Sequence, residues 1–104
     1  MSAPRSAAFE KAAEEVKRLT KPLPNEDKLE LYGLYKHSIG EDWSKAPKPS
    51  PWDFKGKAKY AAWQKIYESG ISAEEAQAKY VTKVEELKKN YGYDENKEPE
   101  VIGA

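Results

Sequence analysis

The chain has 104 residues, which is enough for one domain and too short for two. Its 18 basic residues balance 18 acidic residues, so the overall charge does not indicate a nucleic-acid or anionic partner, and any anion site must come from locally clustered lysines. Cysteine is absent, which excludes disulfides, thiolate catalysis and cysteine metal sites, while a 12% aromatic content is sufficient for a compact core.

No targeting or membrane segment is evident along the sequence. Residues 1–8 contain one arginine and no apolar run typical of a secretory signal. No stretch approaches the roughly 18 apolar residues that a membrane span needs. We therefore expect a cytoplasmic protein.

The first two helices are predicted from apolar residues that recur at spacings of three and four. The first covers about residues 6–19, and its stripe consists of Phe9, Ala12, Ala13, Val16 and Leu19. A break at 21–24 follows, after which Asn25 is a suitable N-cap and Gly40 is a suitable end for the second helix. This helix places Leu29, Tyr32, Tyr35, Lys36 and Ile39 on overlapping faces.

A long connection separates this pair from two further helices. Residues 41–54 contain Pro47, Pro49 and Pro51, and this alternation prevents a regular helix. The third helix is predicted over about 56–68. The fourth begins with a capping box, Ser72 to Glu75, and runs to about Tyr91, with a buried stripe of Ala76, Tyr80, Val84, Leu87 and Tyr91. Because no segment shows the alternation of a strand, we expect an all-α fold.

Four sequence blocks, in order, resemble the acyl-CoA-binding protein family. They read FEKAAEEV from Phe9, YGLYK from Tyr32, DFKGKAKYAAW from Asp53 and KVEELKKNYG from Lys83. The resemblance implies a four-helix up-down-down-up bundle with a ligand groove and no catalytic centre. It implies an acyl-CoA-binding domain over residues 6–92. The polar composition of the ends predicts flexible termini at 1–5 and 93–104.

The lysines and tyrosines of these blocks are the candidate site for the phosphates of the ligand. Tyr32 and Lys36 are four residues apart, so a hydroxyl and an ammonium on one helical face can converge on a phosphate. Lys55 and Lys59 repeat that spacing. The resemblance assigns Tyr32, Lys36 and Lys59 to the 3′-phosphate, with Lys17 and Lys55 nearby. A lysine pair at this spacing is commonly only a solvated helix face, and both interpretations stay open for Lys17 and Lys55.

The remaining parts of the ligand have candidate partners too. Stacking of adenine on Tyr35 would contribute about 1–3 kcal/mol. The resemblance implies that Tyr80 also contacts the ligand, although a core tyrosine is the alternative. Burial of the acyl chain contributes about 0.8 kcal/mol per methylene, and Leu29 and Ala13 are candidates for lining its groove. Trp63 is interpreted as packing between helices.

Two positions depart from the usual family pattern. Lys28 stands where the family often has a hydrophobic residue such as methionine, and the loop with Trp43, Trp52 and three prolines is unusually aromatic and slightly longer. Either departure could affect the ligand groove.

Two functions other than a carrier are alternatives. A helical module that binds a partner peptide through its tyrosine-rich face would leave the lysine spacing unexplained. A thioesterase or acyltransferase needs an activated nucleophile, for which the sequence offers Ser, Tyr and the single His37. We therefore expect no catalytic residues, no metal and no cofactor. The predicted function is the binding, transport and buffering of long-chain acyl-CoA by a monomer, without nucleic acid and with at most transient membrane contact.

Overall fold

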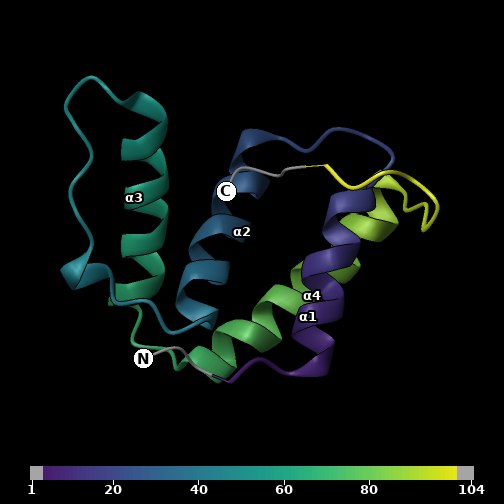
Figure 1. The fold of residues 1–104 in the computed structure, drawn as a ribbon, viewed down its shortest axis with the longest axis horizontal. Coiled ribbons are helices and arrows are strands. Elements are labelled where there is room, and N and C mark those ends of the chain that lie inside the picture. The colour runs from purple at the N-terminus through teal and green to yellow at the C-terminus, as the bar shows by residue number, and fades with distance from the viewer. Residues whose placement is uncertain (1–3, 101–104) are drawn as a thin grey trace.

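The computed structural model describes residues 4–100, which form four α-helices with two short 3₁₀ turns between them (Figure 1). The elements are α1 (Ala7–Glu15), η1 (Val16–Arg18), α2 (Asn25–Ser38), η2 (Trp43–Lys45), α3 (Phe54–Glu68) and α4 (Ala73–Tyr91). The only β-type pairing among these residues is an isolated bridge between Leu19 and Tyr93. The all-α prediction is confirmed. None of the described helices has the length and apolar character that a membrane crossing requires.

The helices run up, down, down and up along the chain (Figure 1). Helices α2 and α3 therefore point the same way although they are consecutive, and the chain between them has to return along the length of a helix. Residues 39–53 make this return, with η2 near the start of the connection. The parallel arrangement thus explains why this connection is long.

Helices α3 and α4 both begin at a side-chain N-cap. The predicted capping box of α4 is confirmed, with the Ser72 hydroxyl accepting from the Glu75 amide at 3.0 Å and the Glu75 carboxylate accepting from the Ser72 amide. Helix α3 begins at Phe54, two residues before the predicted start, because the Asp53 side chain accepts from the amide of Gly56 at 2.9 Å.

Two other boundaries differ from the prediction. The first helix is α-helical only to Glu15, and its last turn is the 3₁₀ turn η1 before extended Leu19. Asn25 is the first residue of α2 and not its N-cap, since Pro24 occupies the cap position in extended conformation without a side-chain hydrogen bond.

The core lies where α4 crosses α1 and α2. Phe9 of α1 and Val84 of α4 are fully buried. The predicted stripes of the first and fourth helices are largely confirmed; the buried apolar residues are Phe9, Ala12, Val16, Leu19, Leu23, Leu31, Leu34, Trp63, Ala76, Tyr80, Val84 and Leu87. Burial of each large apolar side chain contributes about 1.5–3 kcal/mol, so this cluster is the main source of stability.

Two partly buried ion pairs hold α4 to its neighbours. The Lys88 ammonium lies 3.0 Å from the carboxylate of Glu15 on α1, and the Lys83 ammonium lies 2.7 Å from that of Asp27 on α2. The hydrogen bonds to these carboxylates raise the pKa of both lysines above the usual range. Both lysines therefore stay charged at neutral pH, and their two ion pairs constrain how α4 lies on α1 and α2.

Helix α3 approaches α2 closely at a glycine. A Cβ atom on Gly33 would lie 2.8 Å from the carbonyl oxygen of Ala62 and 3.2 Å from Cγ1 of Ile66. A larger residue at position 33 would therefore push the two helices apart.

The C-terminal end of α2 is held by polar contacts. The Nε2 atom of His37 lies 2.6 Å from the carbonyl oxygen of Ile71, in the loop between α3 and α4. The Gln77 amide donates to the carbonyl oxygens of Ser38 at 3.1 Å and Pro4 at 2.7 Å. The single histidine therefore has a structural contact in this fold.

The described part of the C-terminal tail lies against the segment after α1. The amides of Asp94 and Glu100 donate to carbonyl oxygens of η1 at 3.1 and 2.9 Å. The Lys97 ammonium donates to the carbonyl oxygen of Leu19 at 2.7 Å. The tail thus docks mainly through its backbone, which does not require the apolar stripe that the sequence lacks.

The predicted flexibility of residues 1–5 and 93–104 stays a prediction. Residues 1–3 and 101–104 lie outside the described part of the chain. For residues 93–100, the contacts with η1 and Leu19 provide a physical reason for some order.

Deletion of residues 93–104 should change the free energy of unfolding by less than about 1 kcal/mol. Each tail hydrogen bond contributes about 0.5–1.5 kcal/mol, whereas ordering the backbone costs about 1–2 kcal/mol per residue. Urea unfolding of the full and shortened chains measures the difference. Lys97→Ala, which removes the ammonium contacts with Leu19 and Glu100 and leaves the tail backbone intact, is the matched control. A larger loss on deletion would mean that the tail packs more strongly than its hydrogen bonds indicate.

Candidate ligand-binding site

A groove of about 710 Å³ lies between α2, α3 and the connection that joins them. We call it the α2–α3 groove. Helix α2 and the turn after it supply one wall, α3 supplies another, and the proline-containing segment closes one end. The lining residues are Tyr32, Lys36, Ile39, Gly40, Glu41, Asp42, Lys45, Ala46, Pro47, Pro49, Gly56, Lys59, Tyr60 and Trp63.

Two lysines from different helices converge on one aromatic ring in this groove. The Lys36 ammonium lies 5.8 Å from the ring centroid of Tyr32, and the Lys59 ammonium lies 5.5 Å from the same centroid. At these distances each cation interacts with the π-face. The arrangement places two positive charges and one phenol together, which suits an anion with several acceptor oxygens.

Lys36 has a counter-ion in the free protein. Its ammonium lies 2.9 Å from the carboxylate of Glu41, and also 5.6 Å from the ring centroid of Trp63. Because both partners of this ion pair are partly exposed, it contributes only about 0.2–1 kcal/mol. An anionic ligand can therefore displace Glu41 at a low energetic cost.

The groove also contains a buried donor. Trp63 is 5% exposed, and its indole Nε1 has no hydrogen-bond partner among residues 4–100. A buried unsatisfied donor costs about 1–3 kcal/mol. Sequence reasoning interpreted Trp63 as packing alone, although its position four residues after Lys59 places it on the same helical face.

Comparisons with known proteins agree on one family. The family model for acyl CoA binding protein matches residues 6–84. An acyl-CoA-binding protein homolog of Manduca sexta is 46% identical over 80 residues, covering 76% of this chain and 86% of that protein. The chain belongs to the acyl-CoA-binding protein family.

A solved structure supports the same assignment. The crystal structure of acyl-CoA-binding protein 2 of Oryza sativa superposes with a TM-score of 0.72 at 40% identity, covering 80% of this chain and 89% of that chain. The family resemblance and the four-helix fold inferred from sequence are thereby confirmed.

The structure brings together three of the predicted site residues. Tyr32, Lys36 and Lys59 all line the α2–α3 groove. Their assignment to a phosphate stays a prediction. Within residues 4–100, no three His, Cys, Asp or Glu side chains are grouped closely enough to hold a metal ion.

Tyr35 and Tyr80 lie elsewhere, in an aromatic cluster with Phe9. The ring centroid of Tyr35 is 5.6 Å from that of Phe9 and 6.0 Å from that of Tyr80. The Arg5 guanidinium lies over the Tyr35 ring at 6.0 Å. Burial and the neighbouring Tyr35 raise the pKa of Tyr80, so its hydroxyl stays protonated. Neither tyrosine lines the α2–α3 groove, and their ligand contacts stay predictions.

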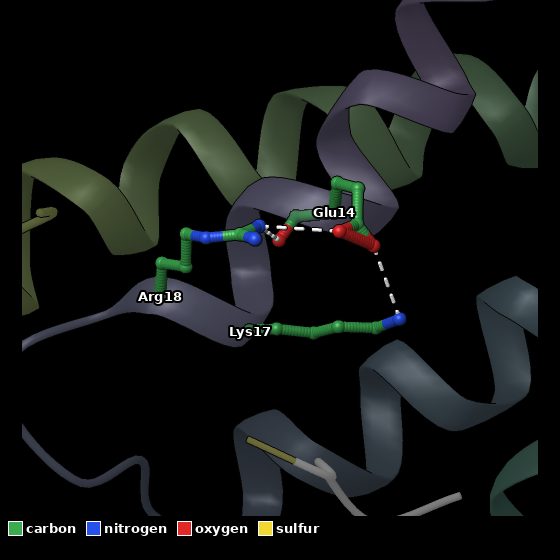
Figure 2. Close-up of polar contacts among 3 residues, drawn as sticks. All are labelled: Glu14, Lys17 and Arg18. Carbon is green, nitrogen blue, oxygen red and sulfur yellow. Dashed lines mark hydrogen bonds and ion pairs between the residues drawn. The ribbon is translucent and has the colours of Figure 1, made fainter. Parts of the chain in front are cut away.

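Lys17 forms an ion pair with Glu14, three residues before it in the chain. Figure 2 shows the Glu14 carboxylate between Lys17 and Arg18, each at 3.2 Å. These hydrogen bonds lower the pKa of Glu14. Spacings of three and four residues on one helix favour this pairing. Lys17 does not line the α2–α3 groove.

Lys55 and Leu29 also lie outside the α2–α3 groove. Lys55 is exposed in the first turn of α3. Leu29 lines a second and larger groove of about 1230 Å³ between α2, α3 and α4, together with apolar residues such as Leu34, Ala62 and Ile66. Leu29 and Lys36 therefore line different grooves, although both belong to α2.

Trp43 holds the connecting segment against α3. Its ring centroid lies 4.9 Å from that of Tyr60 and 5.5 Å from that of Tyr67. Its indole N–H donates to the carbonyl oxygen of Tyr60 at 3.2 Å. The wall of the groove that includes Pro47 and Pro49 follows directly after this anchor.

Trp43→Ala should lower the free energy of unfolding by about 2–3 kcal/mol, somewhat less than a fully buried tryptophan would lose. Trp52→Ala is the matched control, because Trp52 is 83% exposed and should change stability by less than about 0.5 kcal/mol. Urea unfolding measures both values. Equal losses for the two variants would contradict the anchoring role of Trp43.

Proposed function

We propose that this protein binds one long-chain acyl-CoA and transports and buffers it without changing it chemically. The observation that carries this proposal is the convergence of Lys36 and Lys59 on Tyr32, in a chain of the acyl-CoA-binding protein family. The resemblance further supports a cytoplasmic, monomeric carrier.

The 3′-phosphate is assigned to the α2–α3 groove. A phosphate monoester carries about −1.5 to −2 charges near neutral pH, so it can engage both ammonium groups at once. The Tyr32 hydroxyl is a further donor, and the N–H of Trp63 lacks a partner among residues 4–100. Binding replaces the Glu41 carboxylate beside Lys36.

The acyl chain is assigned to apolar surface that begins near Leu29. This residue lies three positions before Tyr32, so the two are neighbours on the surface of α2. Adenine is assigned to Tyr35, which requires the Arg5 guanidinium to leave the ring. Lys17, Lys55 and Tyr80 are proposed as additional contacts.

A thioesterase is the alternative function. The backbone contact of His37 argues against it. A thioesterase needs a base beside a nucleophile. The Nε2 atom of His37 instead lies 2.6 Å from the backbone carbonyl oxygen of Ile71. We therefore propose a carrier and not an enzyme.

Titration calorimetry with palmitoyl-CoA should show one ligand per chain. Incubation of the same complex should release no free coenzyme A thiol beyond the uncatalysed rate. Absence of binding heat with folded protein at several temperatures would contradict the carrier, and protein-dependent thiol release would indicate an enzyme.

Lys36→Ala should weaken acyl-CoA binding by roughly ten- to a hundredfold, because a hydrogen bond to a charged group contributes about 1.5–3 kcal/mol. Removing the 3′-phosphate from the ligand should weaken binding to the wild type at least as much, since it deletes the partner of Lys36, Lys59 and Tyr32 together. The variant should then distinguish the two ligands less than the wild type does, because only Lys59 and Tyr32 remain to contact the phosphate.

Calorimetry with both ligands completes this cycle. Lys89→Ala, which removes an exposed lysine on α4, is the matched control and should bind like the wild type. Far-ultraviolet circular dichroism checks that the variants are folded. Strictly additive losses would show that Lys36 does not contact the 3′-phosphate.

A further inference from the structure

Two large aromatic side chains are strongly exposed beside the α2–α3 groove. Trp52 is 83% exposed and Phe54 is 76% exposed, whereas Tyr67, another exposed aromatic side chain, reaches only 37%. Neither Trp52 nor Phe54 lines the groove. Because the two exposed residues are only two positions apart in the chain, this segment is a candidate interaction surface.

Hydrogen bonds fix the backbone of the segment that carries both residues. The amide of Asp53 donates to the Ser50 carbonyl oxygen at 3.1 Å, which closes a turn with Pro51 and Trp52 at its centre. The Asp53 carboxylate then caps α3, of which Phe54 is the first residue. The aromatic pair is therefore presented by a turn and a helix end.

Positive charge is concentrated around the pair. Residues 45–57 contain four lysines and a single acidic residue, Asp53, although the whole chain has no net charge. All four lysines are exposed, and the Lys57 ammonium lies 6.0 Å from the ring centroid of Phe54. We define the loop patch as Lys48, Trp52, Phe54 and Lys57, which are not among the candidate contacts for acyl-CoA.

We propose that the loop patch docks on the surface of an anionic phospholipid bilayer. Tryptophan and other amphipathic aromatic side chains favour the interface between lipid headgroups and acyl chains. A lysine near an anionic bilayer raises partitioning about fivefold. The patch combines both features on a protruding segment, and it requires no bound acyl-CoA.

Docking through this patch would also orient the ligand groove. The same segment supplies Lys45, Pro47 and Pro49 to the wall of the α2–α3 groove. A protein held at the bilayer by Trp52 and Phe54 therefore has this groove next to the lipid surface. This places the groove where an amphipathic ligand can leave or enter the bilayer.

An anionic bilayer fits the loop patch better than a protein partner or a second copy of this chain does. A protein partner must provide a concave, complementary surface of about 500 Å² or more for each side, and nothing in the patch matches a particular one. A symmetric dimer through the patch would bring Lys48 and Lys57 of one copy towards the same lysines of the other. An anionic lipid surface removes this repulsion and accepts protruding aromatic side chains.

Cosedimentation of the ligand-free full chain with vesicles tests the proposal. We expect binding to vesicles with about 30% phosphatidylserine, little binding to pure phosphatidylcholine, and weaker binding as salt rises from about 0.1 M to about 0.5 M. The double variant Trp52→Ala/Phe54→Ala should bind at least about fivefold more weakly, and Lys48→Ala/Lys57→Ala about tenfold or more.

Two controls show whether a loss of vesicle binding is specific to the loop patch. One tests the effect of removing positive charge elsewhere, and the other tests whether acyl-CoA binding is retained. Lys11→Ala/Lys89→Ala removes the same charge at exposed positions on α1 and α4 and should bind vesicles within about twofold of the wild type. Calorimetry with palmitoyl-CoA should give similar affinities for the wild type and the patch variants, so a defect in lipid docking is distinguishable from loss of ligand binding.

Three results would overturn the inference. The first is equal binding to anionic and neutral vesicles, and the second is wild-type binding by the aromatic double variant. The third is patch-dependent binding of a single-stranded oligonucleotide, or patch-dependent dimerisation in sedimentation velocity, without vesicle binding.

Discussion

The close contact between α2 and α3 at Gly33 determines where the groove lies and what it contains. An interior glycine destabilises a helix by about 0.5–1 kcal/mol, and here that loss accompanies an approach that no Cβ atom would allow. Lys36 is three residues after Gly33, and Lys59 is three residues before Ala62, which Gly33 faces. Each lysine is thus about one turn from the contact. The helix approach itself therefore sets the distance between the two ammonium groups around Tyr32.

The parallel direction of α2 and α3 has a second consequence, which concerns the connection. A short turn joins only antiparallel helices, so this chain needs a long return segment (Figure 1). Trp43 fastens the start of that segment to α3, and prolines restrict the remainder. One side of the segment completes the α2–α3 groove, while the turn at its end exposes Trp52. A topological requirement thus provides both a wall of the α2–α3 groove and an exposed aromatic surface beside it.

Sequence periodicity predicted the four helices because each buries a stripe against its neighbours, and the capping box located the start of α4. The family resemblance, and not periodicity, identified Tyr32, Lys36 and Lys59, which all line the α2–α3 groove. Periodicity has limits. It could not predict that Glu41 pairs with Lys36, since this contact depends on how the chain turns after α2. It could not place Lys17 either, because the nearby Glu14 competes for that charge. The tail contacts η1 through backbone hydrogen bonds, which do not depend on the identity of the side chains. The sequence therefore contains no indication of these contacts.

The pairing of Lys36 with Glu41 also bears on which anions the groove can select. In the free protein, one carboxylate compensates one of two ammonium groups that lie near the same ring. A ligand carboxylate would only exchange one such pair for an equivalent one, with little gain. A phosphate monoester brings more charge and three acceptor oxygens, so it can engage Lys36 and Lys59 together while Glu41 moves into solvent. The pairing of Glu41 with Lys36 therefore supports the proposed preference of the groove for a dianionic phosphate over a free fatty-acid carboxylate.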